Sequence, residues 1–214
     1  MLKTKVKASS VTNLTDARYF AAWEIEWLGF NFDAGSGAYI QPQAMQAIKE
    51  WVDGVKIIGE FGLQPPEEIL SAADLLELDG VQLGQFSGLD TLKALHDNEA
   101  PILLEVVVEE AGRLKEATAG WPAMAPYVEA FLLNFDKNGI GWDSLTGPPL
   151  EYLQGLCRDY PILISLDFNA ETLEEALDIL QPYGINVRGG AEEKVGFKSF
   201  DELDELFEAL ETFD

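Results

Sequence analysis

The sequence predicts an α/β protein of the (βα)8 class, a single-domain TIM barrel that spans residues 1–214. Short apolar runs rich in Val, Ile, Leu and Phe alternate along the chain with longer stretches at helical spacing, which is typical of repeated βα units. Eight such runs can be counted, the number of strands in a closed (βα)8 barrel. The 47% hydrophobic content is ample for one large core, and the length leaves little room for insertions, because such barrels typically have about 250 residues.

The expected strands are short and apolar, and a helical stretch follows each of them. In the first strand, Val6 and Ala8 alternate with lysines, as in a pleated strand. A doubly wound sheet is the alternative, but no Gly-x-Gly-x-x-Gly motif follows the first strand. The expected strands are 3–8, 27–32, 55–61, 80–83, 102–107, 130–134, 162–166 and 184–187.

Several expected helices begin with recognisable start signals. Pro66 is followed by Glu67, and Asn169 is followed by Glu171, so a proline or a capping residue precedes an acid in the first turn. The longest irregular region, 135–149, contains glycines and two prolines and should form a loop over one mouth of the barrel. The expected helices are 14–24, 42–52, 66–73, 89–96, 109–118, 149–159, 170–181 and 200–213.

In a barrel of this class the functional site lies at the carboxyl ends of the strands. After the first strand, Ser9 and Ser10 lead into Thr12, Asn13 and Asp16, which suit a tight turn and a helix start. The other residues expected at this face are 33–38, Gly62, Gly84, Gln85, Val107, 134–136, 167–169 and 188–191.

Composition and charge exclude several classes of function. The net charge of −24, with only 14 Lys and Arg against 38 Asp and Glu, argues against nucleic acid and against anionic membrane surfaces. No apolar run is long enough to cross a bilayer and no signal-peptide pattern opens the sequence, so a cytoplasmic location is expected. With one cysteine, Cys157, and one histidine, His96, neither an intramolecular disulfide nor a Cys/His zinc site is expected, and no metal or other cofactor is predicted.

Seven different short motifs are spread along nearly the whole chain. They are Lys-Ala-Ser-Ser-Val-Thr-Asn at 7–13, Leu-Gly-Phe at 28–30, Ser-Gly-Ala-Tyr-Ile at 36–40, Val-Gln-Leu-Gly-Gln at 81–85, Leu-Leu-Asn at 132–134, Tyr-Gly-Ile-Asn-Val at 183–187 and Gly-Phe-Lys at 196–198. In order and spacing they resemble the phosphoribosylanthranilate isomerase family, (βα)8 enzymes of tryptophan biosynthesis that perform an Amadori rearrangement. The family's first motif reads Lys-[Ile/Val]-Cys-Gly-[Ile/Leu]-Thr-Asn.

The resemblance implies where the catalytic groups should stand. The family uses a cysteine after strand one as general base and an aspartate after strand six as general acid, and these positions are Ser9 and Asn134 here. A serine without a basic partner cannot accept a proton near neutral pH, and an amide has no proton to give. The arginine of the family's Ser-Pro-Arg-Tyr motif is replaced by Ala38.

The resemblance also implies a phosphate site, which is altered here. The glycine pair after strand seven is replaced, so that Asp167 puts a carboxylate where backbone amides should meet a phosphate. After strand eight, Arg188, Gly189 and Gly190 keep a glycine turn and add a positive charge. Together with Asn186, they are the expected ligand-binding residues for a small phosphorylated or other anionic ligand.

Three hypotheses remain open at this stage. The first is a non-catalytic or repurposed homologue of the isomerase, which binds a ligand or a protein partner. The second is an enzyme of changed specificity that uses Asp136 or Asp167, although both also suit turn and cap positions. The third is a working isomerase. A protein partner would need an exposed apolar patch, for which the candidates are Trp121, Pro122, Met124 and Tyr127, and packing of this stretch in the core is the alternative.

Overall fold

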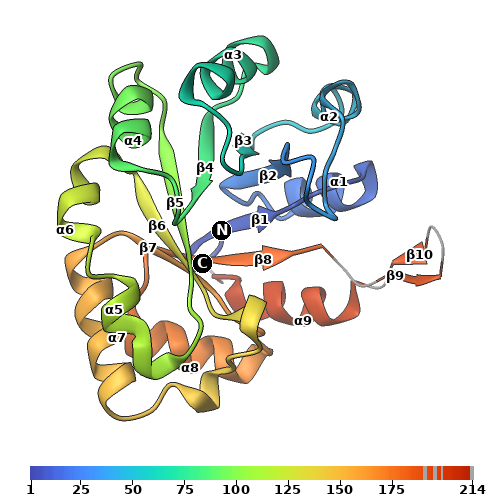
Figure 1. Cartoon of the computed structure of the whole chain (residues 1–214). Coiled ribbons are helices and arrows are strands. Elements are labelled where there is room, and N and C mark those ends of the chain that lie inside the picture. The colour runs from blue at the N-terminus through green and yellow to red at the C-terminus, as the bar shows by residue number, and fades with distance from the viewer. Residues whose placement is uncertain (190–191, 195–196, 199, 213–214) are drawn as a thin grey trace.

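The computed structural model describes residues 1–189, 192–194, 197–198 and 200–212. Eight parallel strands pair in sequence order, and β8 pairs with β1 to close the barrel (Figure 1). The predicted (βα)8 class is therefore confirmed. The strands are β1 (Lys5–Ser9), β2 (Trp27–Asn31), β3 (Lys56–Glu60), β4 (Gly80–Gly84), β5 (Ile102–Val107), β6 (Ala130–Asn134), β7 (Ile162–Ser165) and β8 (Gly184–Arg188).

Helices surround the barrel and bury one face against the strands (Figure 1). Two of them begin with side-chain caps. The side chain of Asn13 accepts a hydrogen bond from the backbone N–H of Asp16, and Asn169 forms a reciprocal capping box with Thr172. The main helices are α1 (Leu14–Ala22), α2 (Pro42–Lys49), α3 (Pro66–Leu76), α4 (Leu89–His96), α7 (Pro148–Asp159), α8 (Ala170–Leu180) and α9 (Asp201–Leu210).

The structure corrects one predicted helix and adds a hairpin. The single helix expected at 109–118 is wrong, because Gly112 within this range weakens helical structure. Four short segments occupy the region instead: η1 (Ala111–Arg113), α5 (Leu114–Ala117), α6 (Trp121–Met124) and η2 (Ala125–Tyr127). The loop expected at 135–149 contains η3 (Asp136–Asn138) and η4 (Trp142–Ser144), and β9 (Glu192–Lys194) pairs antiparallel with β10 (Phe197–Lys198) away from the barrel (Figure 1).

The candidate apolar patch is largely part of the core. Trp121 is 1% exposed and stacks on the ring of Phe131, with 3.8 Å between the ring centroids, whereas Pro122 is exposed. The interpretation of this stretch as core is thus confirmed for Trp121. Among the described residues, no helix is both long enough and apolar enough to cross a membrane.

The barrel interior is apolar in its lower part, toward the amino ends of the strands, and polar in its upper part, toward their carboxyl ends. Six buried side chains, among them Trp27 from β2 and Leu103 from β5, form a cluster separate from those beneath the helices. Above this cluster lies Lys7 of β1, which is fully buried and paired with Glu60 of β3. Gly29 of β2 leaves the room for this pair, because a Cβ atom there would clash with Glu60 Oε1 and come within 2.6 Å of Lys7 Nζ.

We therefore expect Gly29→Ala to lower the free energy of unfolding by about 3 kcal/mol, since it must displace a buried ion pair. Gly84→Ala is the matched control, because Gly84 also belongs to a barrel strand but a Cβ atom there would meet nothing within 4 Å. Urea unfolding of both variants measures the difference. Equal stabilities would contradict the role given to Gly29.

Candidate functional site at the barrel mouth

The upper barrel carries a ring of polar side chains, one from each strand. Because side chains alternate along a strand, these residues lie at equivalent heights near the carboxyl ends, where small-molecule sites of this fold class lie. We call this set the polar ring. Its members, in strand order, are Ser9, Asn31, Glu60, Gln82, Glu105, Asn134, Ser165 and Asn186.

The polar ring lines two cavities that share Arg188 and Gly189. The central cavity, of about 480 Å³, is lined by the ring residues of β1 to β6 and by the first loops. The side cavity, of about 540 Å³, lies between the ends of β7 and β8 and the start of α9. Both volumes fall in the range of about 300–1,000 Å³ that is usual for small-molecule sites.

The Lys7–Glu60 ion pair fixes the floor of the central cavity. Lys7 Nζ lies 2.6 Å from Glu60 Oε1, and the two side chains are 0% and 5% exposed. Burial alone would raise the pKa of Glu60, but the charge of Lys7 and hydrogen bonds from Lys7 and Ser10 outweigh it and lower the pKa below its ordinary value. Glu60 is therefore held as a carboxylate.

Ser10 takes a left-handed backbone conformation at the end of β1, with φ at 56°. A residue with a Cβ atom pays about 1 kcal/mol for this conformation, and the first motif of the isomerase family has glycine here. Ser10 Oγ donates a hydrogen bond to Glu60 Oε2 at 2.9 Å, and the Ser10 N–H lies 3.2 Å from both oxygens of Glu60. These bonds offset the strain and tie the first loop to β3.

Ser9 lies between a lysine and an amide. Lys7 Nζ donates to Ser9 Oγ at 2.7 Å, and Ser9 Oγ donates to Asn186 Oδ1 at 2.6 Å. Ser9 thus has a basic residue as neighbour, which the sequence analysis did not foresee. Because this lysine is bonded to Glu60 at 2.6 Å, it acts toward Ser9 as a hydrogen-bond donor.

Asn134 belongs to a second charged network at the rim. Its Nδ2 donates to Glu105 Oε1 at 2.7 Å, and its Oδ1 accepts from the backbone N–H of Lys137 at 3.0 Å. Lys137 Nζ lies 2.8 and 2.9 Å from the two oxygens of Glu105. The carboxylate that binds Asn134 is therefore itself paired.

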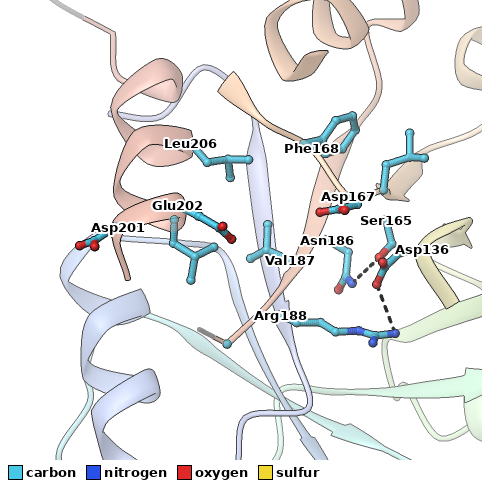
Figure 2. A pocket seen from close by; sticks show the side chains of 13 residues that line it. Asp136, Ser165, Asp167, Phe168, Asn186, Val187, Arg188, Asp201, Glu202 and Leu206 are labelled. Atoms are coloured by element: carbon cyan, nitrogen blue, oxygen red, sulfur yellow. Dashed lines mark hydrogen bonds and ion pairs between the residues drawn. The ribbon is translucent and has the colours of Figure 1, made fainter. Parts of the chain in front are cut away.

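Figure 2 shows the side cavity, where the other predicted site residues lie. Arg188 reaches toward Asp136, with 3.5 Å between Nη2 and Oδ2, and Asn186 Nδ2 donates to Ser165 Oγ at 3.1 Å. Asp167 is exposed and lines the same cavity, together with Asp201 and Glu202 of α9. Four carboxylates thus share this cavity with one arginine. Gly190, the remaining predicted ligand-binding residue, lies outside the described residues.

The structure therefore separates the predicted residues into two places. Ser9 and Asn134 line the central cavity, Asp136, Asp167 and Asn186 line the side cavity, and Arg188 and Gly189 belong to both. Sequence reasoning missed several strand residues of the mouth, and only their alternation within apolar strands could have marked them. They are Lys7, Asn31, Glu60, Gln82, Glu105 and Ser165. Lys137, in η3 after β6, was missed as well.

Cysteine chemistry is not supported by the surroundings of Cys157. Burial raises the pKa of this thiol to about 12, so the reactive thiolate is scarce near neutral pH. The side chain lies in α7, away from both cavities at the mouth. Within the described ranges, no group of three or more His, Cys, Asp or Glu side chains is arranged to hold a metal ion.

Fold and site together define a class: a TIM-barrel protein with a small-molecule cavity at the carboxyl ends of its strands. No family model matches the chain. The N-(5'-phosphoribosyl)anthranilate isomerase of Caldanaerobacter subterraneus is 27% identical over 209 residues, covering 96% of this chain and 97% of the relative. That of Rubrobacter xylanophilus is 28% identical over 201 residues, covering 91% and 93%.

Solved structures agree with these relatives. The phosphoribosylanthranilate isomerase of Thermus thermophilus superposes with a TM-score of 0.76 at 29% identity, covering 97% of this chain and 98% of that one. Another, 23% identical with a TM-score of 0.75, holds reduced 1-(o-carboxyphenylamino)-1-deoxyribulose 5-phosphate and shares the fold. The chain is a homologue of the phosphoribosylanthranilate isomerases over nearly its whole length, as its motifs indicate.

The lowered pKa of Glu60 predicts how acid affects stability. A carboxyl group whose folded pKa lies below its ordinary value of about 4.5 contributes stability above that pH and loses it as the pH falls through the folded pKa. In the double variant Lys7→Met, Glu60→Gln, we expect stability at neutral pH to stay within about 2 kcal/mol of the unaltered chain. Its fall with acid, measured by urea unfolding across the acid range, should be shallower.

The control for this prediction is the exposed pair of Lys49 and Glu77. The double variant Lys49→Met, Glu77→Gln also removes one lysine charge and one glutamate charge, but at the surface. It should leave the acid dependence of stability unchanged, because exposed ion pairs contribute little to the free energy of unfolding. An acid dependence that is the same with and without the Lys7–Glu60 pair would contradict the assignment.

Proposed function

We propose that this chain is a phosphoribosylanthranilate isomerase homologue that no longer catalyses the Amadori rearrangement and acts as a small-molecule-binding barrel. The observation that carries the proposal is the state of the two positions where the family has its general base and general acid. Ser9 and Asn134 both line the central cavity, and both are held in hydrogen-bond networks: Ser9 by Lys7 and Asn186, and Asn134 by Glu105 and the backbone of Lys137.

The environment of Ser9 argues against a role as base. The rearrangement needs a group that removes a proton from the sugar carbon next to the ring. Ser9 Oγ already accepts a hydrogen bond from Lys7, and this lysine forms an ion pair with Glu60. A protonated lysine cannot take the serine proton, so neither side chain can serve as a base near neutral pH.

The environment of Asn134 argues equally against a role as acid. Opening of the ribose ring needs a proton delivered to the ring oxygen, and an amide nitrogen does not release one. Glu105 and Lys137 lie next to Asn134, but they neutralise each other at 2.8 Å. General acid and base groups each contribute about 10²- to 10⁴-fold to a rate, so the loss of both removes most of the catalysis.

An enzyme of changed specificity that uses Asp136 or Asp167 has less support. Asp136 is engaged by Arg188, and Asp167 lies at an exposed position of the side cavity. Ser9 and Asn134 line the other cavity, so these four residues do not converge on one point. A working isomerase would need different groups in the central cavity from those that line it.

The deciding experiment is a turnover assay with phosphoribosylanthranilate. We expect the purified chain to be about 10⁴-fold or more slower than the Thermotoga maritima isomerase, which is a solved structural relative. Ser9→Cys, Asn134→Asp returns both groups of the family and should raise turnover by about 10²-fold or more. Turnover by the unaltered chain at the level of the reference enzyme would refute the proposal.

The matched control places the same two groups on the outer surface of the barrel. Ser71→Cys, Asn98→Asp should leave turnover at the level of the unaltered chain, because both residues are exposed, on α3 and just after α4, and line neither cavity of the mouth. Circular dichroism of every variant verifies that the barrel is folded. If turnover rose as much in this control as in Ser9→Cys, Asn134→Asp, the gain would not depend on placing the two groups at positions 9 and 134.

A small phosphorylated or other anionic ligand at the junction of the two cavities is a second candidate function. Arg188 favours it, because its side chain is 48% exposed at the end of β8 and its ion pair with Asp136 is long, at 3.5 Å. The relative with a bound 5-phosphate analogue has the same barrel. The carboxylates of Asp167, Asp201 and Glu202 in the side cavity oppose such a ligand.

Titration with inorganic phosphate tests this second candidate. If the anion site is retained, Arg188→Gln should weaken phosphate binding by about tenfold or more, since a charge-assisted hydrogen bond is lost. Arg158→Gln removes an exposed arginine on α7, outside the mouth, and should have no effect. Calorimetry of the three proteins gives the comparison, and equal binding by all three would exclude Arg188 as the anion ligand.

A further inference from the structure

We propose that a groove at the amino ends of β5 and β6 is the docking site for a proline-rich, basic segment of a partner protein. The groove has a volume of about 570 Å³ and lies at the opposite end of the barrel from the mouth. One wall comes from the end of α4 and the turn before β5, and the other from residues 126–129 between α6 and β6. Figure 1 shows α4 and α6 side by side on the outside of the barrel. None of the groove residues lines a cavity of the mouth, so the proposal goes beyond the function proposed there.

The apolar lining of the groove is the first observation. Tyr127 contributes a half-buried aromatic ring, Pro101 and Pro126 are exposed, and Ala100 and Val128 are half-buried beside them. Grooves lined by aromatic side chains bind proline-rich segments, because such segments already have the extended polyproline II shape and lose little entropy when they dock. Tyr127 is also one of the residues that the sequence offered for contact with a partner protein.

The charge of the groove is the second observation. Asp97, Glu99 and Glu129 line it, and all three side chains are exposed, whereas none of the described residues that line it is Lys or Arg. At the margin, Lys93 Nζ lies 5.8 Å from the centroid of the Tyr127 ring, so this ring already attracts a cation. The groove therefore complements the Arg and Lys side chains of a basic segment and repels an acidic one.

The fixed shape of the groove is the third observation. The N–H of Glu99 donates to the carbonyl oxygen of His96 at 2.9 Å, which holds the turn after α4. The N–H of Glu129 donates to the carbonyl oxygen of Ile102 at 2.8 Å and so joins the two walls. The rings of His96 and Tyr127 also meet across the groove, edge to face, with 5.5 Å between their centroids. Because the walls are already connected, little free energy is lost in ordering them when a segment binds.

The test measures the fluorescence anisotropy of a labelled synthetic peptide, Arg-Pro-Leu-Pro-Pro-Arg, as the full chain is titrated into it. We expect this peptide to bind with a submillimolar dissociation constant. The peptide Arg-Gly-Leu-Gly-Gly-Arg has the same charges without the prolines, and it should bind about fivefold or more weakly because a flexible chain loses more entropy on docking. The peptide Glu-Pro-Leu-Pro-Pro-Glu should not bind, because its charges are repelled.

Variants of the groove locate the binding. Glu99→Gln, Glu129→Gln should weaken binding of the basic proline peptide by about fivefold, the loss expected for two exposed ion pairs. Tyr127→Leu removes the aromatic surface and should weaken binding by a similar factor. The matched control is Glu67→Gln, Glu68→Gln, which removes two exposed charges from the first turn of α3 and should leave binding unchanged.

Each outcome decides the proposal. Binding that needs the prolines and the groove residues, and that the α3 control leaves unchanged, supports it. Failure of the basic proline peptide to bind, equal binding of the glycine peptide, or equal weakening in the α3 control overturns it. A second copy of the chain as occupant would appear in sedimentation as a dimer that Tyr127→Leu abolishes, and this too would overturn it. Urea midpoints verify that the variants are folded, and if Tyr127→Leu is not, Glu99→Gln, Glu129→Gln decides alone.

Discussion

The buried ion pair between Lys7 and Glu60 is the interaction on which the rest of the mouth depends. A charged lysine inside a barrel is tolerated only when its charge is compensated and its N–H groups are bonded, and here Glu60 and Ser9 meet both needs. The pair requires a neighbour without a side chain, which Gly29 supplies. It also requires further donors to Glu60, which the left-handed turn at Ser10 supplies.

Cations at the rim of the barrel are also paired with carboxylates. Three ion pairs, each made of a cation and a carboxylate from different parts of the chain, compensate the positive charges of Lys7, Lys137 and Arg188. Further carboxylates, from Asp16, Asp167, Asp201 and Glu202, leave the lining of the two cavities with an excess of negative charge. Ser9 and Asn134 belong to the networks of the ion pairs, because Ser9 bonds to Lys7 and Asn186, and Asn134 bonds to Glu105 and to the backbone of Lys137.

The sequence predicted the architecture well, because eight apolar strands in alternation with helices leave few other arrangements. It also located Ser9, Asn134 and Arg188 at strand ends, which the barrel then brought to one face. The partners of these residues could not be foreseen. Glu60 lies 53 positions from Lys7, and only closure of the barrel shows that they meet. The helix expected at 109–118 failed for a local reason, since Gly112 outweighed a weak apolar period.

The ion pairs also join parts of the barrel that backbone hydrogen bonds do not. Lys7 on β1 reaches past β2 to Glu60 on β3, and Arg188 at the end of β8 reaches past β7 to Asp136 after β6. Each pair therefore links two parts of the barrel that are separated by one intervening strand. The Lys7–Glu60 pair is buried, whereas the side chains of Arg188 and Asp136 are 48% and 30% exposed. Separation of β1 from β3 would therefore leave a buried charge without its partner. Strands β1 to β3 should accordingly open as one cooperative unit, which keeps this side of the central cavity formed.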